Sequence, residues 1–173
     1  MSAFCRLLEQ ADEQHACRLV VRGTRIDGIV TLSDLQMLPV RPALFLFVTH
    51  FELLMSETIR RHFQESDAWL KTLTAGRQQK VRDNWERLNA ENLAIDMISA
   101  SEFCDKRQVL LTLNNLADSR KQSEKQLKAI EDLRDSLAHS SDFALTRANA
   151  LNAVAVTKIA RKWIDHLTAG LKQ

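Results

Sequence analysis

Hydrophobic and polar positions follow two different periods along this chain. The first 41 residues contain its only strand-like segments, Cys17–Arg22 and residues 25–30, both rich in branched aliphatic side chains. Gly23 and Thr24 lie between them. Two such runs around a small turn predict a β-hairpin.

Short helices are expected on both sides of this hairpin. Before it, residues 4–13 place two leucines and an alanine on one side of a helix. After it, Ser33 is a suitable N-cap for a short helix that Pro39 must end. Residues 1–41 are therefore expected to form one small α-β-hairpin-α unit.

The remainder, residues 42–173, has the three-to-four-residue period of amphipathic helices. The whole chain contains only four glycines and two prolines, so it has few of the residues that usually form turns and end short strands. The expected helices cover residues 42–63 with Pro42 in the first turn, 67–73 ended by Gly76, 78–92, a segment from the Ser99–Glu102 capping box to about Asn115, 123–138, and 142–169. The predicted fold is mainly α, an up-and-down helical bundle behind the hairpin unit.

Composition and charge narrow the class of protein. The chain is 45% hydrophobic and 27% charged, as in ordinary globular proteins, and its net charge of +2 gives no overall basic field for a nucleic acid. Three widely spaced cysteines predict reduced thiols in a cytoplasmic protein. The longest apolar run, residues 43–48, is too short to span a bilayer, and no signal peptide is predicted.

The segment Gly28-Ile-Val-Thr-Leu-Ser-Asp34 resembles the closing stretch of a CBS domain, and residues 1–41 resemble such a domain without its first strand. In CBS domains that bind adenosyl nucleotides, the Asp bonds the ribose and the Thr lies near phosphate. The resemblance therefore implies these roles for Asp34 and Thr31. The alternative is local: Thr31 ends a strand, while Ser33 and Asp34 cap the next helix.

The segment Leu133-Arg-Asp-Ser-Leu-Ala-His-Ser140 resembles the signature of the HEPN superfamily. That signature is an Arg, a polar residue and a His four to six residues after the Arg, at the end of the penultimate major helix. Arg134, Asp135 and His139 occupy the three positions. The resemblance implies a homodimer and metal-independent endoribonuclease or RNase-like activity in a defence or stress pathway, with an antitoxin or another regulatory partner.

A second match with the same spacing, Arg161 to His166, shows that the bare pattern is not specific. Arg134 is expected inside the apolar stripe of its helix, where its charge needs a partner. Arg161 falls away from the stripe of the last helix and is expected to be an exposed charge. Context therefore favours the first pair.

The spacing of Arg134 and His139 also has a geometric consequence. Residues five apart on a straight helix diverge by about 140°. The two side chains can converge only if the helix ends near Ala138, or if two subunits supply them. Ser140, Ser141 and Asp142 are suitable terminating residues.

Three roles follow for this triplet if RNA is the substrate. His139 would exchange protons with the reacting oxygens, Arg134 would stabilise charge on the phosphate, and Asp135 would orient the other two. The structural alternative is a catalytically silent binding module, in which Arg134 pairs with Asp135 or a neighbouring helix and His139 caps carbonyls. Whether the chain is an enzyme stays open, and no cofactor or metal site is predicted. The chain contains no tyrosine, which excludes regulation by tyrosine modification.

Overall fold

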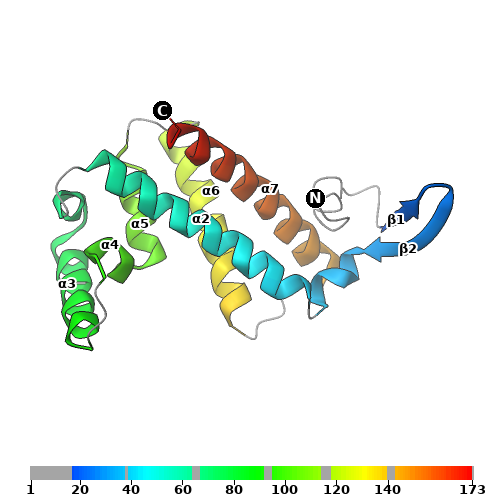
Figure 1. The fold of residues 1–173 in the computed structure, drawn as a ribbon, viewed down its shortest axis with the longest axis horizontal. Helices are drawn as coiled ribbons and strands as arrows, with labels where there is room; N and C mark the ends of the chain where they lie inside the picture. The colour runs from blue at the N-terminus through cyan, green and yellow to red at the C-terminus, as the bar shows by residue number, and fades with distance from the viewer. Residues whose placement is uncertain are drawn as a thin grey trace.

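The computed structural model describes residues 17–37, 39–63, 67–91, 95–113, 118–139 and 143–172. It confirms a mainly helical protein with a small two-stranded antiparallel sheet ahead of the helices (Figure 1). The helix predicted over residues 4–13 lies outside the described residues.

The predicted hairpin is present. Strands β1 (Cys17–Arg22) and β2 (Arg25–Thr31) pair antiparallel from Cys17 opposite Thr31 to Arg22 opposite Arg25, with a shift in register between Val20 and Val21. Gly23 has φ of +61°, a left-handed conformation that glycine adopts without steric cost and that this tight turn requires. The hairpin therefore forms where the branched aliphatic runs and the turn predicted it.

The 3-10 helix η1 (Leu32–Gln36) follows β2 directly, and its cap differs from the prediction. The N-cap is Thr31 rather than Ser33. The Asp34 carboxylate accepts from the Thr31 backbone N–H at 2.6 Å and from its hydroxyl at 3.1 Å, which fixes the helix start two residues earlier. Leu32 and Leu35 are buried in the same core as the long helices, so η1 attaches the hairpin unit to the bundle.

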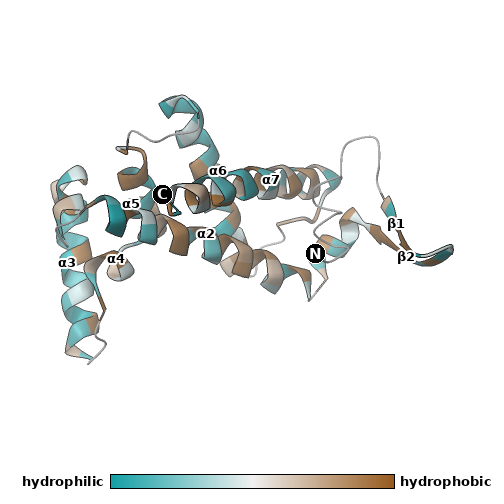
Figure 2. Cartoon of the chain, turned by 45° about the horizontal axis from the view of Figure 1, so that its top comes forward, coloured by the Kyte–Doolittle hydropathy of each residue, from teal (hydrophilic) through white to brown (hydrophobic). Residues whose placement is uncertain are grey.

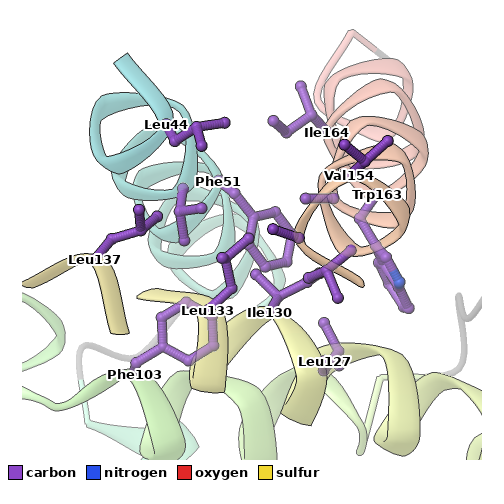
Figure 3. Close-up of a cluster of buried hydrophobic side chains, with 14 of the residues drawn as sticks. Leu44, Phe51, Phe103, Leu127, Ile130, Leu133, Leu137, Val154, Trp163 and Ile164 are labelled. Atoms are coloured by element: carbon purple, nitrogen blue, oxygen red, sulfur yellow. The ribbon is translucent and has the colours of Figure 1, made fainter. Parts of the chain in front are cut away.

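Four helices form the main bundle. They are α2 (Val40–His62), α5 (Phe103–Leu110), α6 (Arg120–Ala138) and α7 (Arg147–Gly170). Helix α2 packs against the other three, and α6 packs against α7. Figure 3 shows side chains from these helices converging around Phe51. Phe51 is fully buried, and its ring centroid lies 6.1 Å from that of Phe103. Burial of a side chain of this size stabilises the fold by about 1.5–3 kcal/mol.

A second, smaller core lies at the far end of α2 (Figure 1). It joins α2 and α5 to η2 (Ala68–Thr72), α3 (Ala75–Ala90) and α4 (Met97–Ala100). Its buried members are Ile59, Trp69, Leu70, Leu73, Val81, Ile98 and Val109. Helix α3 contributes one buried residue, Val81, and is otherwise mostly hydrophilic (Figure 2).

Several predicted boundaries in this region are wrong. Gly76 does not end a helix; it lies in the first turn of α3, and the predicted helix over residues 67–73 is the short η2. The Ser99–Glu102 box does not open one long helix. Asp96 caps the single turn α4 by accepting from the Ser99 N–H, and Glu102 caps α5, which ends at Leu110.

Among the described residues, α2 is the one helix long and apolar enough to cross a membrane on length and composition. Its most apolar window has a mean hydropathy of 1.2, and 33% of that window is buried inside the bundle. The core helix of a bundle passes the same test, and α2 packs against α5, α6 and α7.

Candidate functional site

Helix α6 ends at Ala138, as the sequence predicted, and His139 is its C-cap residue. The His139 backbone N–H donates to the Asp135 carbonyl at 3.0 Å, and its φ of −93° and ψ of 159° turn the chain away from the helix axis. His139 is exposed at this end of α6. Residues 140–142, expected to terminate the helix, lie outside the described residues.

Arg134 lies at the margin of the buried stripe, not inside it as predicted. The buried residues of α6 are Ser123, Leu127, Ile130, Leu133 and Leu137. Arg134 is half-buried, with 36% of its side chain exposed. Its Nη1 lies 3.2 Å from Asp135 Oδ1 and its Nε lies 3.9 Å from Glu52 Oε2 of α2. Both pairings expected under the structural alternative, with Asp135 and with a neighbouring helix, are present.

Glu52 connects Arg134 to a buried lysine that the sequence analysis missed. Lys106 Nζ donates to Glu52 Oε1 at 2.8 Å and to the Ser101 carbonyl at 2.8 Å, and its side chain is only 5% exposed. A buried ammonium requires such partners. Glu52 and Lys106 are 54 residues apart, so no local pattern could indicate the pair.

Arg41 of α2 holds the last turn of α6. Its Nη2 donates to the Ser136 carbonyl at 2.9 Å and to the His139 carbonyl, and its Nε donates to the Leu137 carbonyl at 3.1 Å. The guanidinium also lies 5.9 Å from the ring centroid of Phe143, just beyond this end. The Arg41 guanidinium, rather than the expected His139 imidazole, therefore caps these carbonyls.

The three predicted residues thus lie at one accessible helix end. Arg134 and Asp135 are in contact, Asp135 is half exposed, and His139 is exposed. Within the described part of the chain no hydrogen bond joins the Arg134 and His139 side chains. The last two turns of α6 therefore carry a guanidinium, a carboxylate and an imidazole, and Arg41 and Glu52 of α2 contact this end of the helix.

The second Arg–His pair, Arg161 and His166, has a different structural setting. Arg161 is half-buried, not fully exposed as predicted, because its guanidinium lies 5.7 Å from the ring centroid of Phe47. His166 lies edge-on to Trp163 at 6.0 Å. Both residues sit within the continuous helix α7, so their side chains stay on different faces.

Thr31 and Asp34 lie at the start of η1, just before the N-terminal end of α2 that contacts the end of α6. Thr31 lines a cavity of about 590 Å³ between the hairpin, η1 and the start of α7, with Ser33, Gln36, Thr146 and Arg147. Asp34 is not among the residues lining it, and its carboxylate already binds Thr31. The local capping role of Asp34 is present, whereas the cavity offers hydroxyl, amide and guanidinium groups.

Glu102, Cys104 and Asp105 form the one group in the described parts of the chain with metal-ligand atoms close together, within 4.8 Å. Arg77 donates to both Asp105 oxygens at 2.7 Å and to Glu102 at 3.0 Å, so its guanidinium already supplies the positive charge. Burial raises the pKa of the Cys104 thiol, which disfavours the thiolate that a metal needs. This cluster is best explained as an ion-pair network between α3 and α5.

No family model matches the chain, and it resembles no curated protein or solved structure closely enough to give a match.

Proposed function

We propose that this protein is a metal-independent endoribonuclease or RNase-like effector of the HEPN type, with its site at the C-terminal end of α6. The observation that carries the proposal is the end of α6 at Ala138, where His139 is exposed and the half-buried Arg134 and exposed Asp135 lie about one turn earlier on the same helix. An accessible imidazole and guanidinium at that spacing fit transfer of a phosphoryl group without a metal.

The proposed reaction breaks one bond and forms one. His139 takes the proton of the ribose 2′-hydroxyl as its oxygen attacks the adjacent phosphorus. The bond from phosphorus to the 5′-oxygen then breaks, and that oxygen takes a proton from water or from an imidazolium. The products are a 2′,3′-cyclic phosphate and a 5′-hydroxyl. Arg134 binds the charged phosphate oxygens, and Asp135 holds Arg134 in place.

A homodimer and a cytoplasmic location are part of this proposal. Exposed apolar residues on α2, with Phe45, Leu46 and Leu53 at 37%, 69% and 63% exposure, support a surface that a second copy covers. In a stress or defence pathway such a dimer needs a silencing partner, either an antitoxin or a regulator.

The test is RNA cleavage by purified protein in EDTA, comparing wild type with Arg134→Ala. Arg161→Ala is the matched control, because Arg161 has a histidine at the same spacing but within a continuous helix. Arg134→Ala should abolish cleavage and Arg161→Ala should leave it unchanged. Equal activity in all three proteins would refute the assignment.

The second candidate is a catalytically silent module, and the Glu52–Arg134 and Arg134–Asp135 ion pairs favour it specifically. Under this alternative Arg134 only joins helices, and the ligand is an adenosyl nucleotide in the cavity beside Thr31. A nucleotide at about 100 times its Kd stabilises the fold by about 2.7 kcal/mol. Thermal unfolding with and without ATP measures this, and Thr31→Val, which changes a residue lining the cavity, should remove the shift.

A further inference from the structure

The contacts of Arg41 extend the candidate site beyond its three predicted residues. One guanidinium accounts for three carbonyl oxygens at the end of α6: those of Ser136 and Leu137, and that of His139 itself. Two of these carbonyls belong to the last turn of α6, where the carbonyl oxygens accept no hydrogen bond from within the helix. The third lies beyond the helix, on the residue whose side chain would do the chemistry.

Contacts on both sides of Ala138 constrain more than the helix end. Because Arg41 binds the carbonyls before and after the Ala138–His139 peptide, it fixes the direction in which the chain leaves α6. The His139 backbone is also held through its N–H, which donates to Asp135 at 3.0 Å. With both backbone groups bonded, the imidazole is left with rotation about its own side-chain bonds only.

Helix α2 also contacts the other half of the site, through a longer ion pair. Glu52, which pairs with Arg134, lies eleven residues after Arg41, and eleven residues make about three helical turns. The two residues therefore lie on one face of α2, about 16 Å apart along its axis. A single helix face thus contacts α6 near Arg134 and at His139.

We infer that Arg41 is a positioning residue of the proposed RNase site: it sets the place of His139 relative to Arg134. This inference rests on the proposed function for its catalytic consequence, whereas the placement of His139 can be measured without RNA. A simple capping role would stabilise α6 and leave the chemistry of His139 unchanged, so the two roles give different results.

Arg41→Lys is the decisive variant, because it keeps the positive charge at a helix C-terminus but lacks the planar fork that reaches three carbonyls. Arg82→Lys is the matched control, because Arg82 is also half-buried but belongs to α3, away from the end of α6. Arg41→Lys should lower kcat by about 100-fold with little change in KM, as expected when a reacting group is displaced by about 1 Å. Arg82→Lys should leave both constants at wild-type values.

The second readout is the imidazole proton NMR signal of His139, assigned by its loss in His139→Ala. Arg41→Lys should shift and broaden this signal and speed amide exchange at His139, while Arg82→Lys should not. An unchanged signal, or a loss of kcat that disappears when all variants are assayed well below their Tm, would overturn the inference. If wild type cleaves no RNA, the proposed function fails, and the NMR signal still decides whether Arg41 places His139.

Discussion

Replacing Arg134 by alanine should cost far less stability than replacing Glu52, although the two side chains pair. Arg134 is 36% exposed and its Nε lies 3.9 Å from Glu52, so this pair resembles a surface salt bridge worth less than about 1 kcal/mol. Glu52 also neutralises Lys106, whose side chain is 5% exposed. Removing the carboxylate leaves a buried ammonium with one carbonyl partner, and such losses cost about 3–5 kcal/mol.

Thermal and urea unfolding, followed by circular dichroism, measure the difference. For a chain of this size each kcal/mol moves Tm by about 2–4 °C, so Glu52→Ala should lower Tm by about 6 °C or more and Arg134→Ala by less than about 4 °C. The double variant Glu52→Leu/Lys106→Met should recover most of the loss, because it leaves no unpaired charge. Equal destabilisation by Arg134→Ala and Glu52→Ala would refute this reasoning and favour a purely structural Arg134.

The remaining predictions concern pH, the core and the first turn of η1. Hydrogen bonds from Arg60, and then from Ser99, lower the pKa of Asp96 to about 2 from its ordinary 3.8, so its stabilising contribution is complete above about pH 4 and is lost as pH falls towards 2. In urea unfolding, the free energy of unfolding of Asp96→Asn should therefore be lower than that of wild type at pH 6 and approach it near pH 2. A difference that stays constant with pH would contradict the assignment. Phe51→Ala should destabilise the bundle by about 3–5 kcal/mol in the same assay, and a loss below 1 kcal/mol would show that Phe51 is not at the centre of the core. Asp34→Ala should lower stability by about 1 kcal/mol through the lost cap, whether or not a nucleotide binds.

Sequence reasoning was most successful where the signal is local. The hairpin follows from two aliphatic runs around Gly23, and the end of α6 at Ala138 follows from the polar residues after it. Both features depend on neighbours within a few positions. For this reason the composition of the candidate helix tip could be predicted without knowledge of the fold.

The start of α4 shows where local reasoning failed. Asp96 and Ser99 are both good N-cap residues, and the sequence alone favours the Ser99–Glu102 box. In the structure Arg60 of α2 binds Asp96 at 2.6 Å, and Asp96 in turn accepts from the Ser99 N–H. Arg60 lies 36 positions before Asp96, so a contact between distant helices favours the cap that the local sequence does not.

The supporting residues of the candidate site were missed for the same reason. Arg41 and His139 are 98 residues apart. Arg41 precedes a proline and an apolar run, and nothing nearby marks it as a capping group. The local sequence does not distinguish Lys106 from an exposed helix lysine, because its burial depends on packing against α2. Such pairs are visible only once the packing of α2 on α5 and α6 is known.

The central claim is that His139 carries out proton transfer at the end of α6, and its most direct test is RNA cleavage in EDTA by wild type, His139→Ala and His166→Ala. His166 is the matched control, because it completes the second Arg–His pair within the continuous helix α7. Wild type and His166→Ala should cleave RNA to 2′,3′-cyclic phosphate ends, and His139→Ala should not cleave it. Cleavage by His139→Ala at the wild-type rate, or by none of the three proteins, would contradict the claim.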